Sequence, residues 1–109
     1  MMFNCCTGGV LPDMSAFANL EISAVYAYDA PVGDGTFCES LPGVASGQET
    51  LENALTDGED PAKVFYTVYG RDQQGFAEAL HDADTLEDAK KIADLIISKQ
   101  KHLSETAVI

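Results

Sequence analysis

The chain has 109 residues, of which 46% are hydrophobic, and its formal net charge at pH 7 is −12. This length corresponds to one small domain, and the apolar fraction is that of a globular protein rather than a disordered chain. The negative charge repels nucleic acid and anionic membranes and attracts basic partners, so direct binding to nucleic acid or to a membrane is not expected.

The first third of the chain contains one clear pattern. Residues 1–12 are small and apolar, and we expect either an edge strand or an arm. From residue 20 to residue 29 every second residue is apolar, which favours a strand with one buried face. A helix over residues 13–28, with Asp13 as a candidate N-cap, is the competing prediction because Ala is frequent there. The residues on the predicted buried face are Leu20, Ile22, Ala24, Tyr26 and Tyr28.

The middle of the chain is rich in loops. Residues 30–47 contain repeated Pro and Gly, which interrupt regular structure, and residues 36–38 are a candidate short strand. Residues 48–56 predict a brief helix. Ser46 is its candidate N-cap, and Glu49 is placed to complete a capping box. The apolar stripe of this helix is Leu51, Ala54 and Leu55.

A strand, a turn and a second strand follow. Residues 64–69 are apolar on both faces, which suits a central strand. Residues 70–75 form a polar stretch bounded by glycines, of a length that suits a hairpin loop. Residues 76–82 mix acidic and apolar side chains on one face, so we expect this second strand to lie near an edge of the sheet.

The strongest helix signal begins at Asp84. Asp84 with Glu87, and Thr85 with Asp88, both have the spacing of a capping box. The helix has a broad apolar arc that predicts packing on the sheet rather than a functional role. The arc consists of Leu86, Ala89, Ile92, Ala93, Ile96 and Ile97.

Residues 102–109, which follow the helix, are expected to be frayed.

These elements predict an α+β fold over residues 1–109. It is a small single domain with an antiparallel sheet of three to four strands and a C-terminal amphipathic helix packed on one face.

The sequence lacks the motifs of common catalytic and metal sites. Its three cysteines, Cys5, Cys6 and Cys38, are an odd number without a metal-site spacing, which predicts reduced thiols in the cytoplasm. The start of the chain lacks a signal-peptide pattern, and no apolar run is long enough to span a membrane. His81 adjoins Asp82, but adjacent strand residues point to opposite faces and do not form a catalytic pair. We therefore expect no enzymatic activity, no metal and no cofactor.

The acidic residues offer the clearest functional signal. Residues 1–62 contain no Lys or Arg, and residues 34–60 have a net charge of −7. Such carboxylates can take the place of phosphates in a basic groove, although solubility alone also explains an acidic surface. The candidate partner-binding residues are Asp34, Glu39, Glu49, Glu52, Asp57, Glu59 and Asp60.

Aromatic residues suggest a different interaction. Stacking of bases on an aromatic sheet would also need a basic groove, which this chain lacks, so a core role is the simpler interpretation. The residues concerned are Tyr26, Tyr28, Phe65, Tyr66 and Tyr69.

The segment FYTVYGRDQQGFAEALHDADTLEDAKKIADLI, about a third of the chain, resembles the C-terminal pattern of small orphan proteins of bacterial plasmids and phages. The resemblance consists of a VYG strand, a glycine-closed hairpin and a helix that begins D-x-D-T-x-E-x-A. It implies a strand, hairpin and helix and no particular activity. By type, as a short, acidic protein with few motifs, the chain also resembles phage inhibitors of host defence such as anti-CRISPR proteins.

We therefore expect a non-enzymatic acidic binding or inhibitor protein from a mobile element. Its expected partner is a basic host protein or nucleoprotein complex, blocked through the carboxylate-rich surface. The alternative is a cytoplasmic accessory module that forms a homodimer, or binds a protein partner, through an aromatic sheet face.

Overall fold

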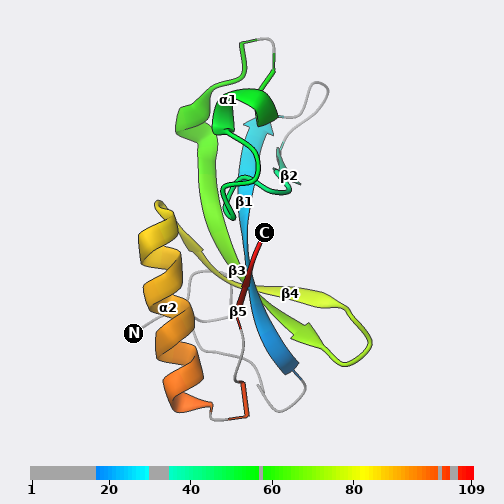
Figure 1. Cartoon of the computed structure of the whole chain (residues 1–109). Coiled ribbons are helices and arrows are strands. Elements are labelled where there is room, and N and C mark those ends of the chain that lie inside the picture. Colours follow the sequence, from blue (N-terminus) through cyan, green and yellow to red (C-terminus); the bar gives the residue numbers. More distant parts are fainter. Residues whose placement is uncertain (1–16, 30–34, 57, 101, 104–105) are drawn as a thin grey trace.

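The computed structural model describes residues 17–29, 35–56, 58–100, 102–103 and 106–109. The described part is a twisted sheet with a long helix at one end and a lobe of short elements at the other (Figure 1). In chain order the elements are β1 (Phe17–Asp29), β2 (Thr36–Ser40), α1 (Leu51–Ala54), the 3-10 helix η3 (Pro61–Lys63), β3 (Val64–Asp72), β4 (Ala77–Ala83), α2 (Leu86–Lys99) and β5 (Thr106–Val108).

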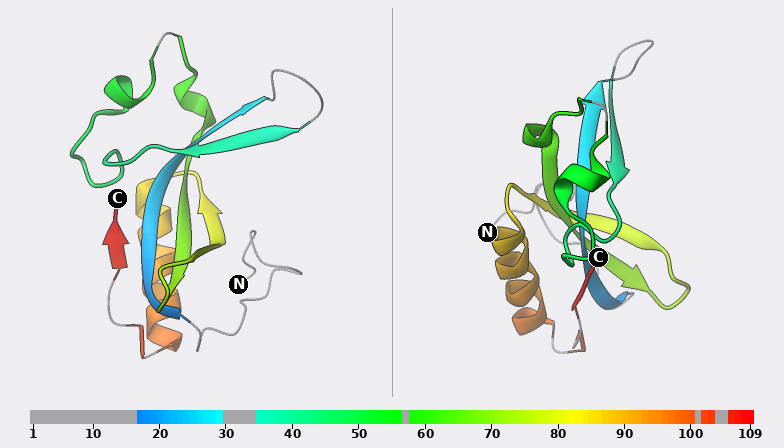
Figure 2. Two further views of the ribbon diagram at one scale, coloured as in Figure 1. Left: turned by 90° about the vertical axis from the view of Figure 1, so that its right-hand side faces the viewer. Right: turned by 45° about the horizontal axis from the view of Figure 1, so that its top comes forward.

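The sheet has the strand order β2-β1-β3-β4, in which all neighbours are antiparallel. The short strand β5 lies parallel to the first half of β1 (Figure 2). The predicted α+β fold with an antiparallel sheet and a helix packed on it is confirmed. The sheet has one strand more than the three or four expected, because β5 was not predicted.

Strand β1 settles the choice between strand and helix for residues 17–28. It is a strand throughout, and Leu20, Ile22 and Ala24 are fully buried on the predicted face. Ser23 and Val25 on the opposite face are buried as well, so the prediction of a single buried face is wrong for the middle of β1. The competing helix is wrong for these residues, because β1 has hydrogen-bonded neighbours on both edges. The predictions for residues 1–12 and for Asp13 lie outside the described residues.

The hairpin of β3 and β4 follows the sequence prediction in outline. Strand β3 lies between β1 and β4, and β4 follows it at the end of the strand order, so the central and near-edge assignments are confirmed. Strand β3 extends to Asp72, so Gly70 lies in the strand rather than in the turn. A Cβ atom at Gly70 would lie 3.0 Å from the ring of Phe17, so a larger residue here would require this ring to shift.

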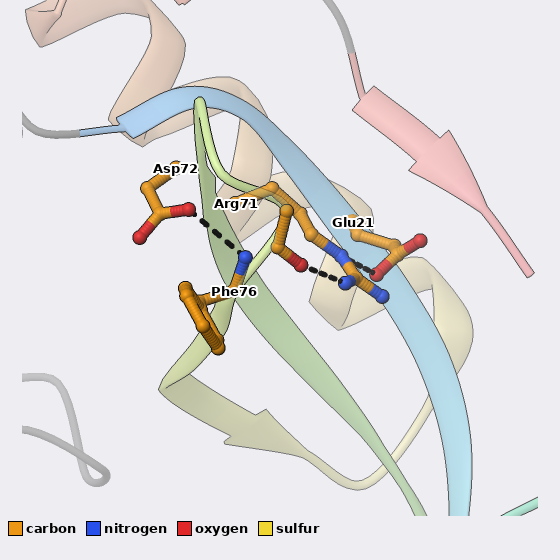
Figure 3. A network of polar contacts seen from close by, with 5 residues as sticks. Glu21, Arg71, Asp72 and Phe76 are labelled. Carbon is orange, nitrogen blue, oxygen red and sulfur yellow. Dashed lines mark hydrogen bonds and ion pairs between the residues drawn. The ribbon is translucent and has the colours of Figure 1, made fainter.

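Side-chain contacts fix the turn of this hairpin (Figure 3). The Asp72 carboxylate accepts hydrogen bonds from the backbone N–H groups of Gln74 and Phe76 at 3.0 and 2.9 Å. Arg71 donates to the Glu21 carboxylate on β1 and to the carbonyl of Gly75, both at 2.6 Å. The turn is therefore tied both to itself and to the neighbouring strand.

Helix α2 covers the first half of β1 and the adjacent parts of β3 and β4. Its N-cap is Thr85, whose hydroxyl accepts a hydrogen bond from the Asp88 N–H at 3.1 Å. Glu87 and Lys91 form an i,i+4 ion pair at 3.8 Å. The predicted apolar arc is confirmed, because its members are buried or pack against the core that contains Leu20, Ile22, Val68 and Leu80.

The C-terminal residues correct the expectation of a frayed tail over residues 102–109. Leu103 is fully buried in the core under α2, and β5 pairs with β1. The Ile109 N–H donates to the carbonyl of Ile22 at 2.8 Å, and the Ile109 carbonyl accepts from the Ala45 N–H at 3.0 Å. The prediction was wrong because these few residues complete an edge of β1 that would otherwise leave backbone groups unpaired.

Replacement of Leu103 by Ala tests this packing. We expect Leu103→Ala to lower the free energy of unfolding by about 2–5 kcal/mol, because it removes a fully buried side chain and leaves a cavity. Urea unfolding followed by circular dichroism measures the change. Lys90→Ala on the exposed side of α2 is the control, with an expected change within about 0.5 kcal/mol. A similarly small effect for Leu103→Ala would contradict the buried position.

Candidate binding surface at the acidic end

Residues 41–56 and 58–63 form a lobe between β2 and β3, which we call the acidic lobe. Its Leu41 N–H donates to the carbonyl of Ala24 at 2.8 Å, so the lobe is anchored on β1. Leu41 and Ala45 pack with Ala24 and Tyr26 in a second core cluster. The lobe therefore covers the second half of the apolar face of β1, whose first half is covered by α2 (Figure 1).

Two helix caps shape the acidic lobe. The N-cap of α1 is Thr50, whose hydroxyl accepts from the Asn53 N–H at 3.2 Å. The predicted cap, Ser46, is wrong, because its hydroxyl donates instead to the carbonyl of Gly43 at 3.0 Å. The α-helix is limited to four residues because residues 42–49 form turns and bends. Asp60 caps η3 by accepting from the Ala62 N–H at 2.9 Å.

A row of aromatic rings lies on the face of β1 and β2 that the acidic lobe adjoins. The rings of Tyr26 and Tyr28 stack with centroids 5.8 Å apart, and Phe37 on β2 lies 5.8 Å from Tyr28. In the strand register Tyr28 is opposite Phe37, and Tyr26 is opposite Glu39. Residues that face each other across antiparallel strands share a side of the sheet, so Glu39 lies on the same side as the rings.

A hollow of about 420 Å³ lies between these strands and the acidic lobe, and we call it the tyrosine hollow. Tyr26, Tyr28 and Glu39 line it from the strands, while Leu55 and Glu59 are among the residues that line it from the lobe. A second hollow of about 400 Å³ shares Leu55 and Glu59 and is completed by Leu51, Glu52 and Pro61. The two hollows therefore adjoin at Leu55 and Glu59, and both have glutamate side chains in their lining.

Contact with the acidic lobe changes the chemistry of Tyr26. A hydrogen bond with the Glu59 carboxylate, together with burial, raises the pKa of the Tyr26 hydroxyl. Tyr26 and Glu59 both line the tyrosine hollow, so this contact lies at its wall. On the other side of the sheet, burial raises the pKa of Tyr69.

The structure describes five of the seven predicted partner-binding residues. Glu39, Glu49, Glu52, Glu59 and Asp60 are all exposed at the end of the molecule that carries the acidic lobe. Glu39, Glu52 and Glu59 line the two hollows, whereas Glu49 lines neither and Asp60 is engaged as a cap. Asp34 and Asp57 lie outside the described residues.

Sequence reasoning did not identify Tyr26, Tyr28 and Leu55 as lining residues. The alternation in β1 placed the tyrosines on the correct face, but it did not show that the second half of this face borders a hollow. Finding the hollow requires the register of β1 with β2 and the position of the chain around Glu59.

Positive charge is concentrated away from the acidic lobe. Lys90, Lys91 and Lys99 belong to α2, at the opposite end of the sheet (Figures 1 and 2). Arg71 is paired with Glu21, and Lys63 at the boundary of the lobe lies 4.0 Å from Asp29. The acidic lobe therefore presents a negative surface with little internal neutralisation.

The aromatic residues do not share one face of the sheet. Tyr66 is opposite Ala24 and so lies on the same side as Tyr26 and Tyr28, whereas Phe65 is opposite Val25 on the other side. Tyr69, four residues along β3, lies on the Phe65 side. The exposed large hydrophobic residues in the described ranges are Phe37 on β2 and Phe76 in the β3–β4 turn.

Other candidate chemistries find little geometric support. Thr67 is opposite Asp82 and Val68 is opposite His81, so the two neighbours point to opposite faces, as predicted. Cys38 is exposed with a free thiol, and Cys5 and Cys6 lie outside the described residues. Within the described ranges, no three His, Cys, Asp or Glu residues are grouped to hold a metal ion. None of the helices that the structure describes is long and apolar enough to cross a membrane.

The two tyrosines with raised pKa values predict a loss of stability in alkali. Their stabilising contribution is complete below pH 10.0, the ordinary tyrosine pKa, and is lost as pH rises through their folded-state pKa values. We expect the free energy of unfolding to fall less steeply above pH 10.0 in a Tyr26→Phe/Tyr69→Phe variant than in the wild type. Urea unfolding at a series of pH values measures the two slopes, and equal slopes would contradict the assignment.

No protein-family model, curated protein or solved structure matches this chain.

Proposed function

We propose that this protein is a non-enzymatic, acidic binding protein that blocks a basic, nucleic-acid-handling host protein or nucleoprotein complex. The carboxylates of the acidic lobe and β2 would occupy the partner's basic groove in place of phosphates. In this proposal the protein comes from a mobile element and acts in the cytoplasm, as phage inhibitors of host defence do.

The observation that carries the proposal is the placement of four exposed carboxylates. Glu39 belongs to β2, and Glu49, Glu52 and Glu59 belong to the acidic lobe that follows it in the chain, and all four are exposed at one end of the molecule. The lysines of α2 lie at the other end. A basic surface would therefore be attracted to a defined end of the protein rather than to its whole surface.

Electrostatics also sets the expected behaviour of the complex. Exposed ion pairs contribute modestly one at a time and are screened by salt, so binding should depend on several carboxylates together and weaken at high ionic strength. If the charge served solubility alone, the position of the carboxylates would not affect inhibition of a partner. A comparison of two equally charged variants separates these explanations.

The first variant, Glu39→Gln/Glu49→Gln/Glu52→Gln/Glu59→Gln, removes these four exposed carboxylates of the acidic end. We expect the wild type to reduce the DNA binding of host nucleic-acid-binding proteins enriched on heparin, and this variant to be about tenfold or more weaker. A mobility-shift assay with a labelled DNA duplex, at low and at high salt, measures the inhibition.

The matched control, Glu78→Gln/Asp84→Asn/Glu87→Gln/Asp94→Asn, neutralises four exposed carboxylates on or near β4 and α2. It changes the net charge by the same amount and should inhibit as well as the wild type. Equal loss in both variants, or no inhibition by the wild type at low salt, would overturn the proposal. Self-association in sedimentation runs that is insensitive to salt would support the alternative of an accessory homodimer.

A further inference from the structure

The tyrosine hollow differs from the rest of the acidic surface because it combines charge with aromatic and aliphatic walls. Its volume of about 420 Å³ is within the range of roughly 300–1,000 Å³ that is usual for pockets that hold small ligands. Glu39 approaches it from β2 and Glu59 from the acidic lobe, while Tyr28 and Leu55 provide apolar surface. An exposed carboxylate such as Glu49 has none of these neighbours in the hollow.

We infer that the tyrosine hollow receives an arginine side chain of the partner, with its guanidinium between Glu39 and Glu59 and its methylene groups against Tyr28 and Leu55. This inference rests on the proposed function, since it names the chemical group of the basic partner that the acidic end recognises.

The lining of the hollow favours arginine over lysine. A guanidinium is planar, carries five N–H donors and can serve two carboxylates at once, whereas an ammonium group acts as a compact point charge. A guanidinium is also more weakly hydrated than an ammonium group and stacks on aromatic rings. Its dehydration on contact with Tyr28 and Leu55 therefore costs less free energy. The two carboxylates repel each other, and the single positive charge of a guanidinium placed between them offsets part of this repulsion.

The contact between Tyr26 and Glu59 prepares the hollow for this ligand. The Tyr26 hydroxyl and the Glu59 carboxylate meet at the wall of the hollow, where this contact raises the pKa of Tyr26. Tyr26 is itself only 8% exposed and stacks on Tyr28, so the carboxylate is held by a ring that is fixed in the core. A positioned acceptor loses less side-chain freedom on binding than a free one.

The second hollow adjoins the tyrosine hollow at Leu55 and Glu59. It is lined by Glu52, Leu51 and Pro61 in addition to the shared Leu55 and Glu59. A partner segment that places an arginine in the tyrosine hollow would therefore continue over a mixed apolar and acidic surface. This arrangement suits a basic segment of a protein better than a free small cation.

The test needs no identified partner. The ¹⁵N-labelled protein is titrated with acetyl-Gly-Arg-Gly-amide and with acetyl-Gly-Lys-Gly-amide, and amide chemical shifts report the binding site and affinity. We expect the arginine peptide to shift signals of β1, β2 and residues 54–59, and to bind about threefold or more tightly than the lysine peptide.

Three single variants locate the contact. Glu39→Gln and Glu59→Gln should each weaken the arginine peptide about fivefold. Glu78→Gln removes the same charge from an exposed position on β4, away from the hollow, and should change the affinity less than about twofold. Unchanged amide spectra without peptide show that each variant is folded, and glutamine at residue 59 can still accept from the Tyr26 hydroxyl.

Several outcomes would overturn the inference. Equal affinity for the two peptides, an equal effect of Glu78→Gln and Glu59→Gln, or shifts spread over α2 would each indicate diffuse attraction instead of a pocket. A flat titration together with intact inhibition of DNA binding would reject the pocket and leave the proposed function standing. Arginine-selective binding without any inhibition would reject the proposed function and keep the pocket.

Discussion

Strand β1 is the constraint on which the rest of the structure depends. Its 13 residues carry backbone groups on two edges, and buried backbone groups need hydrogen-bond partners. One edge is filled by β3 along most of its length. The other edge is divided, since β5 pairs with residues 20–22 and β2 pairs with residues 25–29. Strand β1 therefore brings together β2 and β3 from the middle of the chain and β5 from its C-terminal part.

The same strand explains why the molecule has two different ends. Its apolar face is continuous from Leu20 to Tyr28, but two separate covers lie on it. Helix α2 covers the first half with aliphatic side chains, and the core there is buried. The acidic lobe has one short α-helix and several turns, so it covers the second half less completely and leaves the rings of Tyr26 and Tyr28 beside a hollow. The carboxylates gather where the cover is incomplete, and exposure to water makes their mutual repulsion tolerable.

The elements that could be predicted from the sequence are those set by local patterns. Alternation identified the buried face of β1, and the spacing of Thr85 and Asp88 identified the start of α2. The features that escaped prediction depend on distant contacts. Strand β5 is three residues long and is specified by the open edge of β1 rather than by its own pattern. Ser46 and Thr50 are both good capping residues, and only the turn geometry around Gly43 decides between them. The tyrosine hollow needs the register of β1 with β2, which no local pattern fixes.

The divided edge of β1 also has a kinetic consequence. Ile22 pairs with Val68 on one edge of β1 and with Val108 on the other. Val108 is 86 residues later in the chain, so the pairing of this one residue is complete only when two remote segments have reached β1. Closing long loops costs entropy before the contacts they allow are formed, and domains with many such pairings fold slowly. The hairpin of β3 and β4 is local and can form early. The acidic lobe lies between β2 and β3, so its shape is completed only when β1 has docked on that hairpin, and the surface that carries the charge is among the last parts to be formed.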